Sequence, residues 1–176
     1  LVVGIAVALI SVGIGLILGL VAGYVRVLDA VIMRTMDGLM SIPAILLAIA
    51  LISLSGATLG TVILAIVIPE VPRVVRLVRA VVLTVREEPY VEAAIAAGTR
   101  LPLILKRHIL PNTIAPLIVQ ATYVCASAML TESILGFLGA GIPPEIPSWG
   151  NIMSEGRTYF QISPWIIFFP GIGLAL

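Results

Sequence analysis

Residues 38–69 read GLMSIPAILLAIALISLSGATLGTVILAIVIP and contain no Asp, Glu, Lys or Arg. One helix of these 32 residues would be roughly 48 Å long, whereas a bilayer core of about 30 Å needs about 20 residues. Residues 53–58, SLSGAT, lower helix propensity near the middle, and Thr58 can cap a helix that starts there. The stretch therefore predicts a hairpin of two membrane helices, at about 39–53 and 58–84.

The basic residues flank this hairpin on both sides. Nine of the ten Lys and Arg residues fall in two segments, and basic residues favour the cytoplasmic side of a membrane. The chain between two cytoplasmic segments must cross the membrane an even number of times, as a hairpin does. The nine are Arg26, Arg34, Arg73, Arg76, Arg79, Arg86, Arg100, Lys106 and Arg107. Three of them, Arg73, Arg76 and Arg79, should share a helix face and reach lipid headgroups.

The composition extends this prediction to the whole chain. The 176 residues are 60% hydrophobic and 11% charged, which excludes an ordinary soluble domain. The net charge of +1 gives no sign of a nucleic-acid-binding protein. We expect an all-α, polytopic membrane helix bundle that forms one domain over 1–176. Its further helices should lie at about 1–25, 113–138 and 164–176, with a cytoplasmic loop at 86–112 and an outer loop at 139–163. Because the chain begins and ends inside apolar runs, we expect a fragment.

The first predicted helix carries a glycine every four residues, at Gly15, Gly19 and Gly23. Small residues at this spacing let two helices approach closely in a membrane. The partner can be a helix of the same chain or a second subunit, and we favour the same chain.

The segment 86–112, REEPYVEAAIAAGTRLPLILKRHILPN, predicts two short helices. Pro89 suits the first turn of one helix, and Gly98 suits the left-handed residue just past its end. Thr99 can cap the second helix, and the following membrane helix should start near Asn112. The alanines at 93, 94, 96 and 97 leave the first helix almost bare, while Glu92 and Arg100 supply charge. Such a helix can enter a groove on another protein or pack on its own bundle.

These residues carry a resemblance to a known family. Glu92-Ala93-Ala94, then Gly98, then Ile109-Leu110-Pro111 resemble the EAA loop of binding-protein-dependent ABC transporter permeases. Further similarity runs from Arg34 to Trp165, and it resembles the second permease subunit of the dipeptide, oligopeptide and nickel branch. The chain departs from that branch at 69–72, PEVP, where an aromatic residue is usual, and at Gly136, where serine is usual.

The resemblance implies the type I ABC importer transmembrane fold, with the family's first membrane helix absent here. It implies a permease subunit of the bacterial or archaeal cytoplasmic (inner) membrane, for peptides or a related small solute such as nickel. The implied partners are a homologous permease, two cytoplasmic ATPases, an extracytoplasmic solute-binding protein and the lipid bilayer. The implied ATPase-coupling residues are Tyr90, Glu92, Ala93, Ala94, Gly98 and Arg100.

Other candidate sites are few. Glu132 is an ionisable residue at membrane depth, which makes it a candidate for the translocation path or a carboxylate that reaches water. Glu70 should pair with an arginine such as Arg73, and His108 should have an ordinary interfacial role rather than a metal. No phosphate-binding loop or HExxH motif occurs. We expect no catalytic residue, cofactor or metal, with ATP hydrolysis in separate subunits.

Two other classes of protein remain open on the residues alone. A secondary transporter or channel should show carboxylates or broken helices near the middle of the membrane, and only Glu132 is a candidate. A noncatalytic membrane scaffold would need no bare cytoplasmic helix. Copurification with an ATPase, lost on mutating residues 90–98, would separate the three classes.

Overall fold

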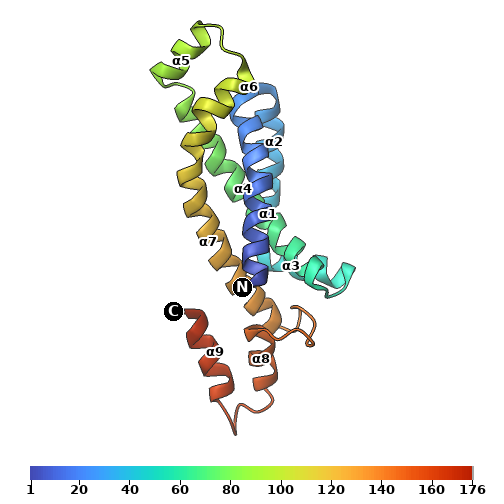
Figure 1. Cartoon of the computed structure of the whole chain (residues 1–176). Helices are drawn as coiled ribbons and strands as arrows, with labels where there is room; N and C mark the ends of the chain where they lie inside the picture. The colour runs from blue at the N-terminus through green and yellow to red at the C-terminus, as the bar shows by residue number, and fades with distance from the viewer. Residues whose placement is uncertain (176) are drawn as a thin grey trace. The chain divides into compact units, whose positions relative to one another are not determined.

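A computed structural model describes residues 1–175 and confirms the all-α prediction. The chain is 81% helical, and no strand occurs in the described part. Figure 1 labels the helices in chain order. They are α1 (Val2–Tyr24), α2 (Arg26–Met40), α3 (Ala44–Ser55), α4 (Leu59–Val85), α5 (Pro89–Ala96), α6 (Leu101–Ile104), the π-helical η1 (Leu105–Ile109), α7 (Leu110–Phe137), α8 (Trp149–Gly156) and α9 (Trp165–Ala175).

The turn between α3 and α4 falls inside the predicted segment 53–58. Gly56 ends α3 with a φ of 83°, a left-handed conformation that suits glycine. The Thr58 hydroxyl accepts a hydrogen bond of 3.2 Å from the Thr61 amide, which confirms that Thr58 caps α4. The Thr61 hydroxyl in turn accepts a bond of 2.9 Å from the Thr58 amide. α4 then continues through Pro69 and Pro72 as one helix.

Two features of the helices differ from the sequence prediction. No helix was predicted over 26–38, where the structure has α2. The helix predicted to start near 113 begins instead at Leu101, because α6, η1 and α7 form one helix over Leu101–Phe137. At the end of η1 the amide of the C-cap residue Leu110 donates to the Leu105 carbonyl, five residues earlier. This wider turn lets the helix continue into Pro111, which has no amide to donate.

Fewer helices than the five predicted meet the criteria for a membrane span. By length and composition, two helices within residues 1–175 qualify, α1 and Leu101–Phe137. α2 and α3 would add a third if they formed one broken span. α4 is long enough at 27 residues, but Glu70 lies near its middle and the arginines lie in its second half. α9 covers 11 residues of the predicted 164–176 helix, whose end at Leu176 lies outside the described residues.

The residues pack into two compact units. One unit comprises residues 1–8, 42–69 and 124–175, and the other comprises 9–41 and 70–123. In the second unit the glycines of α1 pack against valines of α4. A Cβ atom added at Gly15, Gly19 or Gly23 would lie 2.5 to 2.6 Å from the Cβ atoms of Val74, Val78 and Val82 respectively. The glycine repeat therefore packs within the chain, as favoured above.

Ion pairs join α2 to α4 in the same unit. The Arg79 guanidinium donates to both carboxylate oxygens of Asp29, at 2.5 and 2.6 Å. Arg76 donates to Asp37 at 2.5 Å. Arg73 pairs with Glu70 at 2.8 Å, which confirms the partner predicted for Glu70. Each of the three arginines expected to reach lipid headgroups thus has a carboxylate partner: α2 supplies the aspartates for Arg76 and Arg79, and α4 itself supplies Glu70 for Arg73.

The other unit is built on close contacts between α7 and α8. A Cβ atom added at Gly150 would lie 2.7 Å from the Ser133 carbonyl oxygen and 3.0 Å from the Gly136 Cα atom. The Ser148 hydroxyl caps α8 by accepting a bond of 3.1 Å from the Asn151 amide. α8 and α9 run side by side (Figure 1).

Candidate functional site

The segment predicted to couple to an ATPase forms a short exposed helix, α5. Pro89 occupies its first turn, as predicted. Val91 is completely buried and anchors the helix to the chain. Glu92, Ala93, Ala96 and Ala97 are exposed, while Ala94 is partly buried. α5 therefore presents exposed alanines next to a single acidic side chain, together with the exposed side chains of Tyr90 and Ile95.

The end of α5 is a Schellman motif, built around Gly98. Gly98 has a φ of 77°, which confirms the predicted left-handed conformation. The Thr99 amide donates to the Ala94 carbonyl at 3.1 Å, and the Gly98 amide donates to the Ile95 carbonyl at 2.9 Å. Thr99 caps no helix, contrary to the sequence prediction, because α6 begins one residue later and Arg100 takes the N-cap position without a side-chain bond.

A cluster of three polar side chains connects α5 to the helix that follows it. The Asn112 amide donates to the Tyr90 hydroxyl at 3.3 Å and to the His108 carbonyl at 2.5 Å. The Tyr90 and His108 rings lie 5.8 Å apart between centroids, tilted by 45°. Sequence reasoning missed the roles of Asn112 and His108. The available signal was their spacing of four residues, which places both on one face of a helix.

The predicted coupling residues are close in sequence but do not form one contact network. Tyr90, Glu92, Ala93 and Ala94 belong to α5. Arg100 is exposed, and no ion pair joins it to Glu92 within residues 1–175. It lines a pocket of about 400 Å³ together with Pro102, Leu103 and Lys106.

Glu132 lies in α7, away from these residues in the sequence, and only 8% of it is exposed. The neighbouring Ser133 hydroxyl donates to the Met129 carbonyl at 2.9 Å. Its Oε1 atom accepts no hydrogen bond from residues 1–175. Glu132 does not line the pocket beside Arg100.

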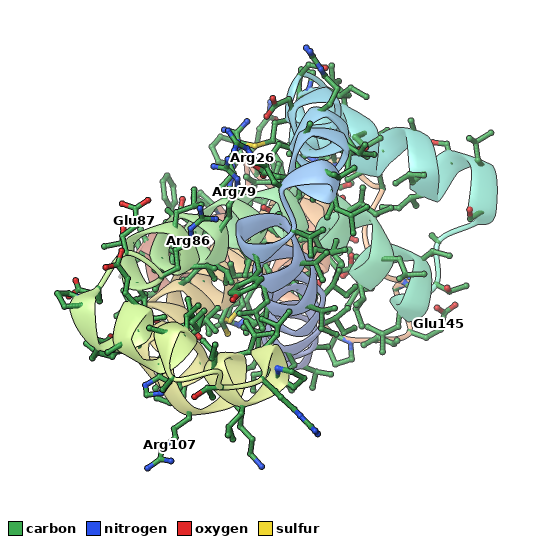
Figure 2. The ribbon with its side chains drawn as sticks, turned by 90° about the horizontal axis from the view of Figure 1, so that it is seen from above. Arg26, Arg79, Arg86, Glu87, Arg107 and Glu145 are labelled. Carbon is green, nitrogen blue, oxygen red and sulfur yellow. The ribbon has the colours of Figure 1, made fainter. Side chains whose placement is uncertain are left out.

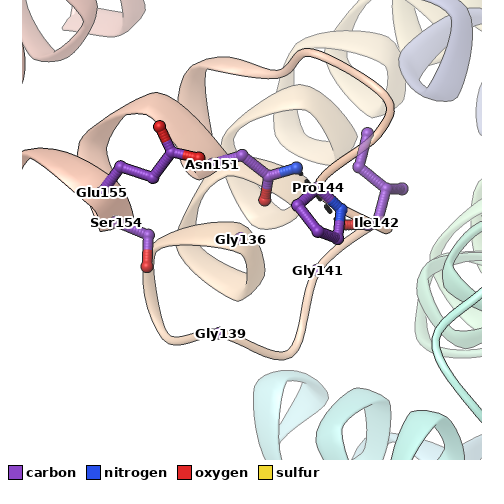
Figure 3. Close-up of a pocket in the computed structure, with 8 residues that line it drawn as sticks. All are labelled: Gly136, Gly139, Gly141, Ile142, Pro144, Asn151, Ser154 and Glu155. Atoms are coloured by element: carbon purple, nitrogen blue, oxygen red, sulfur yellow. Dashed lines mark hydrogen bonds between the residues drawn. The ribbon is translucent and has the colours of Figure 1, made fainter.

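The predicted outer loop folds back on α8 through one side chain. The Asn151 amide nitrogen donates to the carbonyls of Ile142 and Ile146, each at 3.2 Å, and to that of Pro143 at 3.4 Å. Figure 3 shows Asn151 reaching toward this loop at the edge of a pocket of about 220 Å³. Glu145 and Ile146 remain exposed.

Residues 11–176 match the family described as "Binding-protein-dependent transport system inner membrane component". The chain belongs to this family. The description places such components in the inner membrane, and α1 and the Leu101–Phe137 helix are apolar enough to span one.

Individual relatives of this inner membrane component are permeases of ABC transporters. The chain is 57% identical over 155 residues to a probable peptide ABC transporter permease protein of Sinorhizobium fredii, covering 88% of the chain and 53% of the relative. It is 42% identical to a dipeptide transport system permease protein of Alkalihalophilus pseudofirmus, covering 92% and 54%. It is 36% identical to a glutathione transport system permease protein of Pectobacterium atrosepticum, covering 98% and 58%. The chain thus spans little more than half the length of these relatives.

Proposed function

We propose that the chain is part of a permease subunit of an ATP-driven ABC importer. In this role it forms half of a translocation pathway, and a homologous permease forms the other half. Two cytoplasmic ATPases and an extracytoplasmic solute-binding protein complete the assembly. Membership of the binding-protein-dependent family supports this proposal, and the exposed, small-residue surface of α5 supports the assignment of the ATPase contact.

Helix α5 is suited to transmit a movement between two proteins. Its alanine surface lets a groove close around the backbone of the helix, and Glu92 can fix its orientation by pairing with a basic residue of the ATPase. The buried Val91 and the bond from Asn112 to Tyr90 hold α5 to the rest of the chain. ATP binding shifts the permease between inward-open and outward-open states only if the closed ATPase pair binds one state better.

The proposed cargo is a di- or oligopeptide or a related small solute. The names of three relatives give peptides, dipeptides and glutathione as their cargo. All three molecules carry peptide bonds and charged ends, so a pathway for one can pass the others. Nickel, the other cargo of the branch that the sequence resembles, appears in none of these names.

The coupling role is tested in the full-length permease reconstituted with its partners. Gly98→Leu should distort the end of α5, and Glu92→Arg should reverse its charge, so both should uncouple transport from ATP hydrolysis. Glu87→Arg is the matched control, because Glu87 carries the same charge on the exposed turn before α5. Full transport with full substrate-stimulated ATPase activity in both test variants would overturn the assignment. Loss of ATPase copurification on changing residues 90–98 would exclude a channel or a scaffold.

The outer loop is the proposed contact for the solute-binding protein. Glu145 and Ile146 are exposed, while Asn151 holds the loop backbone in place. Glu145→Lys combined with Ile146→Ser should weaken docking of the solute-binding protein without disturbing the loop. Unchanged docking by this double variant, measured by surface plasmon resonance in nanodiscs, would argue against the loop as the contact.

Glu132 is the candidate for a role in the translocation path. Its burial and the open hydrogen-bonding capacity of Oε1 support a partner that residues 1–175 do not supply. Glu132→Gln removes the charge and keeps the shape. If this variant transports every tested peptide as well as the parent protein, Glu132 has no such role.

A further inference from the structure

A basic pocket lies at the start of the longest helix and includes Arg100, one of the predicted coupling residues. Arg100, Pro102, Leu103 and Lys106 line a pocket of about 400 Å³. All four residues are exposed, and Leu103 retains 49% of its accessible surface. The pocket therefore combines two cationic side chains with two apolar ones.

The cations of this segment lack carboxylate partners. Arg73, Arg76 and Arg79 each pair with an acidic residue. Within the described part of the chain, no ion pair forms to Arg100, Lys106 or Arg107. Figure 2 shows Arg107 pointing away from the ribbon. This segment thus offers positive charge that the fold itself does not neutralise.

The length of the helix places this pocket beside the membrane surface. The helix Leu101–Phe137 has 37 residues, which gives roughly 55 Å at 1.5 Å per residue, whereas the hydrocarbon core is about 30 Å thick. About half of the helix must therefore lie outside the core. The residues from 108 to 131 carry no Asp, Glu, Lys or Arg, so Lys106 and Arg107 mark where the helix enters the headgroup region.

We propose that the pocket formed by Arg100, Pro102, Leu103 and Lys106 binds the headgroup of an anionic phospholipid of the cytoplasmic leaflet. The phosphodiester lies between the Arg100 guanidinium and the Lys106 ammonium group. Pro102 and Leu103 contact the glycerol and the upper acyl chains. Basic segments that adjoin a membrane helix attract anionic headgroups through the same combination of charge and location. The proposal uses the membrane orientation of the proposed function but does not depend on transport.

Lipid retention by the purified full-length permease tests the proposal. Native mass spectrometry counts phosphatidylglycerol molecules retained from vesicles of phosphatidylcholine and phosphatidylglycerol. At about 1 kcal/mol per basic residue, Lys106→Gln should weaken retention about 5-fold, and Lys106→Gln with Arg100→Gln about 30-fold. Lys106→Arg should retain the lipid. Arg107→Gln is the matched control, because it removes the same charge from the same segment outside the pocket.

Three outcomes would overturn the proposal. Equal losses from Lys106→Gln and Arg107→Gln would show a general surface potential instead of a site. Displacement of phosphatidylglycerol by inorganic phosphate at similar concentration would show a site for free anions. Unchanged lipid retention in a double variant that no longer binds the ATPase would assign the two cations to the protein partner. Circular dichroism of every variant checks that the helices remain folded. A loss of transport with unchanged lipid retention would contradict the proposed function and not the lipid site.

Discussion

The side-chain amide of Asn112 donates a hydrogen bond of 3.3 Å to the Tyr90 hydroxyl. Tyr90 belongs to α5, and Asn112 belongs to the first turn of α7. The same amide also donates to the carbonyl of His108, a residue of the π-helical segment η1. The proposed ATPase-contacting helix is thus tied by side chains, as well as by the chain, to the helix that enters the membrane.

Breaking this hydrogen bond should weaken the coupling of ATP hydrolysis to transport, while it lowers the unfolding free energy only slightly. Tyr90→Phe removes the accepting hydroxyl and keeps the ring beside His108. We therefore expect the unfolding free energy to fall by about 0.5–1.5 kcal/mol. The number of ATP molecules hydrolysed per transported peptide should rise. Asn112→Ala should cost more, because it also removes the bond to His108. A double-mutant cycle of the two changes measures their interaction, and strictly additive effects on coupling would contradict the link.

The ion pair between Arg79 and Asp29 should stabilise the protein more than the pair between Arg76 and Asp37. The first pair is bidentate, with side chains 29% and 22% exposed, and the second is 44% and 54% exposed. Asp29→Ala should therefore lower the unfolding free energy by about 1.5–3 kcal/mol. Asp37→Ala, the matched control, should lower it by about 0–1 kcal/mol. Denaturant unfolding in detergent measures both, and equal losses would contradict the difference.

The contact of Gly19 with Val78 should tolerate no added methyl group. A Cβ atom at Gly19 would lie 2.5 Å from the Val78 Cβ atom and 3.0 Å from the Val75 carbonyl oxygen. Gly19→Ala should destabilise the protein by about 1–3 kcal/mol, because α1 and α4 must separate. Gly13→Ala should not, since a Cβ atom added there would meet no atom of another segment within 4 Å. Thermal unfolding in detergent compares the two, and indistinguishable midpoints would refute the close approach.

The left-handed conformation of Gly98 should make α5 sensitive to any Cβ atom at this position. No neighbouring atom lies within 4 Å of an added Cβ, so the cost is backbone strain alone, about 1–2 kcal/mol for Gly98→Ala. Gly98→Asn should cost less, because asparagine tolerates this conformation better. Gly38→Ala is the control, with equally open space and no positive φ. Hydrogen exchange of the α5 amides measures the effect, and equal exchange in the alanine and asparagine variants would argue against strain.

Features set by near neighbours in the chain were predictable. The Thr58 cap, the first-turn Pro89 and the left-handed Gly98 each depend on hydrogen bonds or φ angles within a few residues. The pair of Arg73 with Glu70 follows from their spacing of three residues on a helix. The coupling residues were chosen by resemblance to a family, and their role stays a prediction that the experiments above address.

The sequence by itself determined the helical class and the turn at 56–58, because apolar run length and helix capping act locally. Only the tertiary structure decided which carboxylates Arg76 and Arg79 meet. Asp37 and Asp29 lie 39 and 50 residues from Arg76 and Arg79, and nothing local pairs residues so far apart. It also decided that Gly19 faces Val78, and that the helix into the membrane begins at Leu101. The physical reason is that packing and ion pairs between helices depend on how the whole chain folds, whereas caps and turns depend on the residues beside them.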